Sequence, residues 1–486
     1  MNYSNIPILK SLKDYSEDDI AYLHMPGHKG GNVFKKIGYK AFDSELLSMD
    51  VTEVPGIDNL HSPEAAIKEA QELAAEVFGA DQSFFLVNGT TSGIYAMILT
   101  ATNPGDKIII PRNCHKAVTG AVILGRLQPI YINPEVDYKF NIASGISPAV
   151  VQKAIEEHPD AKAVVITNPT FYGVCSDLEK IAKIAHGNNM LLLVDEAHGA
   201  HFGFHTELPR TALQCGADMV AQSTHKTLPS MTQSSMLHLK SDRVDIDKLK
   251  LFLQLTQSTS PSHLLLASLD AARYIMQQKG EELLNDVIYW CNWLKQEINS
   301  QELLYCMSKR DIGRDGIFDV DCTRITINLS KIGLIGTEAD GLLRRRFKLQ
   351  VEMSDLYNIV AICTVGDSVS TLKRLAEALR TIALEEQVQS SSPIAKQAMV
   401  TFDKIPTMQL LPWEAVYQPK EELAAQNCIG RICGEMIVPY PPGIPIIMPG
   451  EIINKELIDY ALACQSNGIK INGVKDASLK YITVLK

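Results

Sequence analysis

The sequence contains no long apolar run, and nowhere do about 18 consecutive apolar residues occur that would form a membrane-spanning helix. Its first residues, MNYSNIPILKSLKDYSEDD, lack the charged start and apolar centre of a secretory signal peptide. No long run of lysine and arginine is present, and the formal net charge is -10, so a nucleic-acid-binding surface is not expected. We therefore expect a cytoplasmic protein that binds neither membrane nor nucleic acid.

Closely spaced cysteine pairs are also missing. The chain has 10 cysteines but no C-x-x-C pair, and the spacing of Cys428 and Cys433 is a poor match to zinc sites. This argues against a disulfide-rich secreted protein and against a zinc ribbon. We expect reduced, mostly buried thiols in a reducing compartment and no bound metal.

Short apolar runs alternate with helical patterns over the first 240 residues. The runs expected to form buried strands are 83–87, 107–111, 128–132, 162–167, 190–195 and 218–223. The clearest helix pattern spans 62–79, with Ser62 as candidate N-cap and Gly79 as candidate terminator. This alternation predicts an α/β domain with a mainly parallel, doubly wound sheet, which binds its ligands beyond the carboxyl ends of the strands.

The remaining chain changes in character along its length. Residues 262–300 predict a long helix, strand-like runs follow at 324–329, 349–355 and 357–365, and the polar stretch 387–393 indicates a linker. The Pro/Gly-rich stretch 438–451 excludes regular helix there. We expect an N-terminal arm (1–25), a large domain (26–260), a helical linker with a small α/β domain (261–388) and a C-terminal α+β domain (389–486).

Polar residues follow the predicted strands. The turn NGTTSG (88–93) opens a helix, and its N–H and hydroxyl groups could cradle a phosphate, although simple helix capping explains it equally well. His115 follows the strand 107–111 and could stack on a flat ring, although a surface histidine is the simpler interpretation of that residue alone.

Two charged residues end apolar strands. Asp195 closes the run 190–195, where a carboxylate needs a cationic partner. Lys226, in QSTHKTL, lies among hydroxyls without a neighbouring acid, and burial would lower its pKa and leave a nucleophilic amine. A phosphate cradle, a stacking histidine, an aspartate and a buried lysine together meet the needs of pyridoxal 5'-phosphate (PLP). A metal site of histidines 198, 201 and 205 is the rival, but their spacing matches no zincin pattern.

These motifs resemble those of the Orn/Lys/Arg decarboxylase family, bacterial fold-type-I PLP enzymes with an aspartate-aminotransferase-like large domain. The matching stretches are HMPGHKGG (24–31), DVTEVPGIDNLHSP (50–63), NGTTSG (88–93), PRNCHK (111–116), NPTFYG (168–173), VDEAHGAHF (194–202), STHKTL (223–228) and GEMIVPYPPGIPIIMPGE (434–451). The resemblance runs from about residue 20 to near the end of the chain. It is to the short form, without the amino-terminal flavodoxin-like domain of the larger members.

The resemblance implies a role for each site residue. Lys226 forms the Schiff base with the cofactor, Asp195 pairs with the ring nitrogen, and His225 assists proton transfer. The residues implied to surround the cofactor further are His115 stacked on one ring face, Ala197 under the other, His198 beside the ring, and Thr91, Ser92 and Ser223 at the phosphate. Glu435 is expected to bind the cationic end of the substrate, while an ordinary surface glutamate explains Glu414 equally well.

The implied reaction is PLP-dependent decarboxylation of a basic amino acid. Arginine, giving agmatine and carbon dioxide, is the expected substrate, and lysine (giving cadaverine) or ornithine (giving putrescine) remains open. A PLP aminotransferase is the more distant alternative, in which Arg324 would grip the α-carboxylate. The family expectation for assembly is a homodimer with shared active sites, or a larger oligomer built from it.

Overall fold

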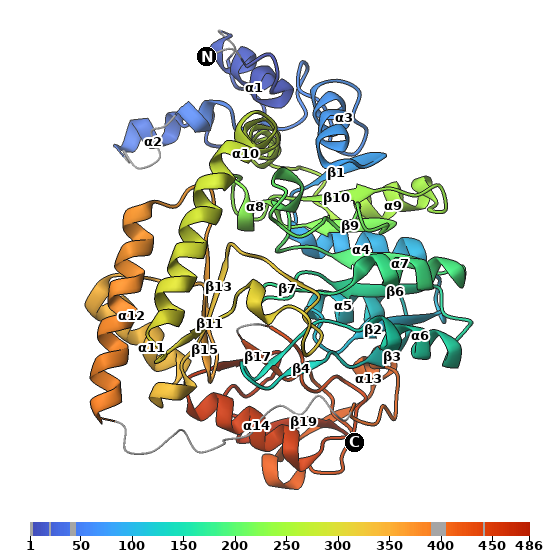
Figure 1. The fold of residues 1–486 in the computed structure, drawn as a ribbon. Helices are drawn as coiled ribbons and strands as arrows, with labels where there is room; N and C mark the ends of the chain where they lie inside the picture. Colours follow the sequence, from blue (N-terminus) through green and yellow to red (C-terminus); the bar gives the residue numbers. More distant parts are fainter. Residues whose placement is uncertain (1–2, 19–20, 39–44, 390–404, 441–442) are drawn as a thin grey trace.

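The computed structural model describes residues 3–18, 21–38, 45–389, 405–440 and 443–486. Within these ranges no helix is both long enough and apolar enough to cross a bilayer. A large sheet with helices lies between an N-terminal helical cap and a C-terminal α+β part (Figure 1). All 10 cysteines are unpaired, and all but Cys215 are buried.

The large domain is organised around a seven-stranded sheet. In spatial order its strands are β1 (Gln82–Leu86), β10 (Ser235–Leu239), β9 (Met219–Gln222), β8 (Leu191–Asp195), β6 (Ala163–Thr167), β2 (Lys107–Pro111) and β3 (Gln128–Ile132). β10 runs antiparallel to both of its neighbours, and the other pairs are parallel. The mainly parallel sheet is therefore confirmed, and each expected strand lies within one residue of its predicted bounds. β10 was not predicted.

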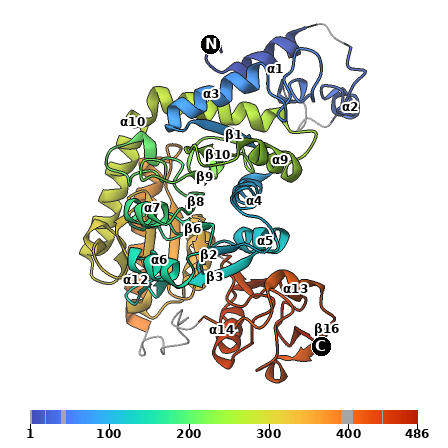
Figure 2. The same cartoon turned by 90° about the vertical axis from the view of Figure 1, so that its right-hand side faces the viewer.

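Helices cover both faces of this sheet (Figure 2). On one face lie α4 (Gly89–Ala101), α5 (Lys116–Leu124) and α9 (Ile246–Thr256), and on the other lie α6 (Pro148–Glu157) and α7 (Leu178–Gly187). A separate apolar cluster fills each interface. Because both faces are buried, most positions of the parallel strands are apolar, which explains why the sequence signal of those strands was clear.

Helix α3 (Ala66–Phe78) begins later than predicted. Its N-cap position is Ala65 and not Ser62, and no side chain at that position caps it. Instead, the carboxylate of Asp58 accepts hydrogen bonds from backbone N–H groups at the start of the helix, those of Glu64, Ala65 and Ile67. The predicted end is confirmed, because Gly79 adopts a left-handed conformation with φ of 73°.

The N-terminal segment contains α1 (Pro7–Glu17) and α2 (Asn32–Ile37). Helix α1 packs on the long helix α10 (His263–Ser300), whose Asp270 carboxylate accepts a hydrogen bond from the backbone N–H of Ile8 (3.1 Å). Helix α10 confirms the helix predicted from residue 262 to 300, and it extends from the large domain to the second sheet (Figure 1).

The second sheet has four antiparallel strands. In order they are β11 (Tyr305–Cys306), β13 (Arg324–Asn328), β15 (Asn358–Ile362) and β14 (Met353–Ser354). Helices α10, α11 (Gly336–Leu342) and α12 (Val369–Gln389) share its apolar core. The predicted linker 387–393 begins inside α12, which continues to Gln389, and the rest of that stretch lies outside the described residues.

The C-terminal part is built from short elements. They are α13 (Pro412–Tyr417), β16 (Lys420–Ala424), β17 (Val438–Tyr440), α14 (Lys455–Ser466), β18 (Lys470–Asn472) and β19 (Tyr481–Leu485). A buried ion pair joins this part to the large domain, because Arg112 Nη1 lies 2.6 Å from Glu451 Oε1. Arg112 follows β2 directly, so the contact also fixes the loop that leads to His115. The predicted domain boundaries themselves stay predictions.

Candidate active site

A cavity of about 390 Å³ lies beyond the carboxyl ends of the parallel strands. The predicted site residues that line it are Lys226, Asp195, His115, His225, Ala197, His198, Thr91 and Ser223. These residues follow different strands, and the sheet brings them together because parallel strands end at the same edge. Two predicted residues, Ser92 and Glu435, do not line the cavity.

Lys226 lies in α8 (Thr224–Thr227), the single helical turn that follows β9. Its Nζ is 3.1 Å from Nε2 of His198. Burial lowers the pKa of Lys226 from its ordinary value, and the negative charge of Asp195 only partly opposes that effect. A lysine with a lowered pKa supplies an unprotonated amine more readily, which is what a nucleophile requires.

Asp195 is the last residue of β8 and is 2% exposed. Its Oδ1 accepts a hydrogen bond from the backbone N–H of Ala197 (3.2 Å). Burial raises the pKa of the Asp195 carboxyl, although the positive charge of Lys226 acts against this. A buried carboxylate at a cavity wall is stabilised when a cation occupies the cavity, so a ligand with a protonated ring nitrogen fits here.

His115 is the N-cap residue of α5, and its Nδ1 accepts the backbone N–H of Ala117 (3.2 Å). Burial lowers the pKa of His115 to about 4, with the positive charges of Lys226 and Lys116 adding to the effect. His115 is therefore neutral near pH 7. A neutral imidazole at the cavity wall can lie against a flat ring without placing a second cation beside it.

His225 precedes the lysine and points its Nδ1 at the carbonyl oxygen of Ser234, 2.7 Å away. Because a carbonyl only accepts, Nδ1 carries the proton and Nε2 is free to exchange one. Burial lowers the pKa of His225, while the bond to Ser234 partly opposes the shift. This arrangement suits a group that takes up and releases a proton.

The start of α4 forms the hydroxyl-rich end of the cavity. Thr91 and Ser223 line it, and so does Thr90, which was not predicted. The Thr90 hydroxyl bonds the hydroxyls of Ser223 and Ser235 and so fixes the position of Ser223. Ser92 is turned away by the helix, and its Oγ donates to the carbonyl of Gly89 (2.8 Å). The free N–H groups of the first turn of α4 and the hydroxyls of Thr91 and Ser223 fit a phosphate group.

Glu435 lies in the C-terminal part, away from the cavity. Its two carboxylate oxygens accept the backbone N–H groups of Lys475 and Thr483, both at 2.9 Å. The side chain thus joins segments of that domain, which sequence spacing could not reveal. Glu414 caps its own helix by accepting the N–H of Leu411 (3.0 Å).

Another glutamate, Glu352, does line the cavity, together with Tyr440 and Ile444 from the C-terminal part. It directly precedes β14 in the second sheet and is exposed to solvent. Its negative charge favours the protonated form of Lys226 and so raises that pKa. The sequence signal that could have identified it is its place between the apolar Val351 and Met353, inside a run predicted to form a strand.

The three histidines of the rival metal site do not converge. His198 contacts Lys226, whereas His201 Nε2 lies 3.0 Å from the Thr323 hydroxyl. His205 Nε2 lies 3.0 Å from Asn285 Oδ1 at the surface. Each imidazole therefore has a separate partner, and the three do not form one ligand set.

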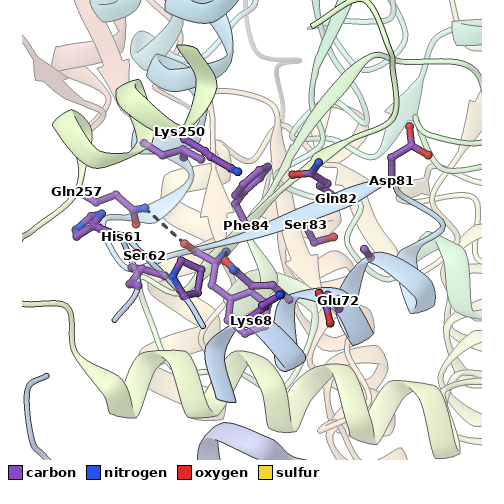
Figure 3. A pocket seen from close by; sticks show the side chains of 16 residues that line it. His61, Ser62, Lys68, Glu72, Asp81, Gln82, Ser83, Phe84, Lys250 and Gln257 are labelled. Atoms are coloured by element: carbon purple, nitrogen blue, oxygen red, sulfur yellow. Dashed lines mark hydrogen bonds between the residues drawn. The ribbon is translucent and has the colours of Figure 1, made fainter. Parts of the chain in front are cut away.

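A second cavity, of about 560 Å³, lies along the outer edge of β1 (Figure 3). Gln257 donates to the carbonyl of Phe85 (3.5 Å) there, so a side-chain amide bonds the free strand edge. The charged side chains that line this cavity are exposed and mixed in sign, namely Lys68, Glu72, Asp81 and Lys250. We assign the chemistry to the first cavity because the half-buried Lys226 and the buried Asp195 lie there.

Comparison with known proteins identifies the family of the chain. The family description "Orn/Lys/Arg decarboxylase, major domain" matches residues 6–371. The description "Orn/Lys/Arg decarboxylase, C-terminal domain" matches residues 395–477. The two matches cover most of the chain and include every strand of both sheets.

Individual relatives extend the comparison. A protein named arginine decarboxylase from Bacillus subtilis (strain 168) is 39% identical over 100% of this chain and 99% of its own length. Inducible lysine decarboxylase from Escherichia coli (strain K12) is 25% identical over 93% of this chain and 75% of its own length. The solved structure of lysine decarboxylase A from Pseudomonas aeruginosa aligns with a TM-score of 0.84 at 21% identity, over 99% of this chain and 80% of that one. The shared fold confirms the predicted fold-type-I architecture, and the family matches show that this chain is a decarboxylase that belongs to the Orn/Lys/Arg decarboxylase family.

Proposed function

We propose that the protein binds PLP in the 390 Å³ cavity and decarboxylates a basic amino acid, with arginine as the substrate. The observation that carries this proposal is the meeting of a half-buried lysine, whose pKa is lowered by its surroundings, and a buried aspartate in one cavity. The full-length similarity to proteins named arginine decarboxylase favours arginine over lysine and ornithine.

The described residues fit the cofactor group by group. Lys226 would hold the aldehyde carbon, and Asp195 would hold the ring nitrogen in its protonated form. His115 would lie on one ring face and Ala197, whose small side chain leaves room, on the other. The phosphate would be held by Thr91, Ser223 and the first backbone N–H groups of α4, with Thr90 acting through Ser223.

Each side chain then has a task in the reaction. When bound, PLP supplies a sink for the electrons that remain as carbon dioxide leaves. The Asp195 carboxylate keeps a proton on the ring nitrogen, which maintains that capacity. Lys226, as a free and unprotonated amine, can take a proton from the incoming substrate amine. Lys226 or Nε2 of His225 then delivers a proton to the α-carbon, and His198 holds the lysine in place.

Glu352 is the residue that we propose for the cationic end of the substrate, in the place first predicted for Glu435. A carboxylate can accept two parallel hydrogen bonds from a guanidinium, which favours arginine over the point charge of lysine. Tyr440 and Ile444 form the adjoining wall. The aminotransferase alternative is not favoured, because Arg324 does not line the cavity where an α-carboxylate would lie.

The test is carbon dioxide release from arginine, lysine and ornithine by the purified protein, with its absorbance spectrum recorded beside it. We expect release fastest from arginine, and an absorbance band of the bound cofactor that disappears in Lys226→Ala. Release from lysine alone would contradict the substrate assignment. Transfer of the amino group to a keto acid without gas release would contradict the reaction.

We further propose a cytoplasmic homodimer that brings two active sites together. At the start of the HMPGHKGG segment, Met25 and the preceding Leu23 have 62% and 94% of their surface accessible, as expected for a surface covered by a second copy. Unpaired buried thiols suit a reducing compartment. Sedimentation equilibrium should give twice the chain mass, and a monomer at micromolar concentration would contradict this.

A further inference from the structure

Three side chains form a continuous line from the interior to the cavity. Arg324, the first residue of β13, is 2% exposed, and its Nη2 donates to Nδ1 of His198 at 3.2 Å. On the other side of the same ring, Nε2 of His198 lies 3.1 Å from Nζ of Lys226. The guanidinium thus reaches the lysine only through the imidazole.

The hydrogen-bond roles along this line follow from the chemistry of arginine. A guanidinium has N–H donors and no acceptor, so Nδ1 of His198 must be the acceptor and carries no proton. Burial lowers the pKa of His198 well below its usual range, and the charges of Lys226 and Arg324 add to this, so the ring is neutral. A neutral ring with an unprotonated Nδ1 has its proton on Nε2, which faces the lysine amine.

We propose that Arg324 is a positioning residue, which holds His198 in the Nε2–H tautomer so that His198 donates to Lys226 and keeps that amine unprotonated whenever it is free. The inference rests on the proposed function and deepens it, because it names what maintains the nucleophile. In the other tautomer Nε2 would be an acceptor, and it would stabilise the ammonium form of the lysine instead.

The charges around Lys226 explain why a hydrogen bond from His198 is needed to keep the amine neutral. Asp195 and Glu352 both favour the ammonium form, whereas burial and Arg324 oppose it. His115 also faces the cavity, and it is neutral above its lowered pKa of about 4. With two carboxylates acting in one direction, the hydrogen bond from His198 adds a short-range preference for the neutral amine.

The surroundings of Arg324 hold it in this position. A Cβ added to Gly173, which has φ of +88°, would lie 2.7 Å from Cβ of Arg324, so the backbone of the NPTFYG turn packs directly against the side chain. The negative charge of Asp321 balances that of the guanidinium. The Phe171 ring, with its centroid 4.6 Å from that of His198, covers the imidazole. Nε and Nη1 of Arg324 have no hydrogen-bond partner among the described residues, so the bond to His198 is a main restraint on the guanidinium.

The first test reads the tautomer directly in the full chain with its cofactor bound. Long-range nitrogen–proton correlation spectra of protein labelled with ¹⁵N-histidine distinguish the two neutral tautomers and the imidazolium. We expect His198, assigned by loss of its signal in His198→Gln, to remain Nε2–H between about pH 6 and pH 9. An Nδ1–H tautomer or an imidazolium would overturn the proposal, and this measurement needs no Arg324 variant to fold.

The second test follows capture of added PLP by Lys226, in protein freed of cofactor, as absorbance against pH. In Arg324→Met the capture midpoint should rise by about one pH unit and capture at neutral pH should slow about tenfold. Arg324→Lys keeps a donor toward Nδ1 and should restore most of the rate. His198→Gln can accept from Arg324 and donate to Lys226, so it should capture PLP faster than His198→Leu.

The outcomes separate the possible roles of Arg324. If Arg324→Met raises KM for the amino acid but leaves the capture midpoint unchanged, the residue grips a carboxylate and our inference is wrong. If Lys does not restore what Met loses, the donor to His198 is not what matters, which also overturns it. Neither the tautomer of His198 nor the pH midpoint of PLP capture depends on carbon dioxide release, so failure of the proposed substrate would leave these two measurements intact.

Discussion

The two walls of the active-site cavity are built on different principles. The sheet-edge wall consists of residues at strand ends, Lys226 and Asp195 among them, and its titratable groups are buried or half-buried with shifted pKa values. The opposite wall comes from the second sheet and the C-terminal part, and its charged group, Glu352, is exposed. A rigid, desolvated wall suits the bond-breaking chemistry, and an exposed wall of mixed origin suits selection of the substrate side chain. Substitutions in the two walls should therefore affect different kinetic constants.

The largest effect is expected at the sheet-edge wall. Lys226→Ala removes the amine that holds the cofactor and moves protons, so kcat should fall by about 10³-fold or more and the absorbance band should be lost. The matched control is Lys240→Ala, at an exposed lysine that follows β10. Comparable activity in Lys226→Ala and Lys240→Ala would remove the basis of the contrast between the walls.

Asp195→Asn should lower kcat by about 10²-fold, because the carboxylate can no longer keep the ring nitrogen protonated. The same change should stabilise the cofactor-free protein near pH 7. Burial raises the pKa of Asp195 in the folded state, so its charged form opposes folding at pH values above the unfolded pKa. Steady-state kinetics check the fall in kcat, and thermal unfolding with and without PLP measures the change in stability of each form. Asp242→Asn, at an exposed position, is the control. A more stable holoenzyme in Asp195→Asn would contradict the assignment.

Glu352→Gln tests the opposite wall and should raise KM for arginine by about 10- to 100-fold with a smaller change in kcat. Because the Glu352 charge raises the pKa of Lys226, the variant should also shift cofactor capture toward lower pH. Glu435→Gln is the comparison, and it should reduce stability while leaving KM near the wild-type value. The reverse pattern, with KM changed only in Glu435→Gln, would restore the prediction made from the sequence.

The smallest effect concerns His115 in the sheet-edge wall and the pH dependence of the free energy of unfolding. Burial lowers the pKa of His115 to about 4, so between pH 6.5 and 4 the unfolded chain binds a proton that the folded chain does not. Stability from this group is therefore lost as pH falls through that window. We expect the free energy of unfolding in urea to fall between pH 7 and pH 5 in the wild type. In His115→Gln this fall should be smaller by about 1 kcal/mol. An unchanged decrease would mean that His115 is not shielded from water.

The sheet-edge wall could be predicted from sequence because parallel strands end at one edge. That rule placed Lys226, Asp195 and His115 in one cavity before any contact was known. It failed for Ser92 because adjacent residues on a helix point about 100° apart, so Thr90 and Thr91 face the cavity instead. Strand β10 was missed because its apolar run, interrupted by His238, is short and has no turn signal typical of a parallel unit.

The opposite wall could not be predicted in the same way. Glu352 and Arg324 reach the site only through packing of the second sheet against the large domain, which no local pattern encodes. Glu435 looked suited to the site because it adjoins a Pro-rich loop, yet backbone groups distant in sequence bind both of its oxygens. Prediction succeeded where one topological rule places a residue at the site. It failed where contacts between segments distant in sequence determine whether a residue reaches the site.

The ion pair between Arg112 and Glu451 limits how this enzyme can be re-engineered. Exchange of C-terminal modules between relatives is an obvious route to altered substrate preference, because Tyr440 and Ile444 come from that module. A graft without a carboxylate at the position of Glu451 would leave the guanidinium of Arg112 buried without its anionic partner, because Arg112 is only 4% exposed. Arg112 lies at the start of the loop that leads to His115. Any chimera must therefore keep this ion pair, or replace both Arg112 and Glu451 together.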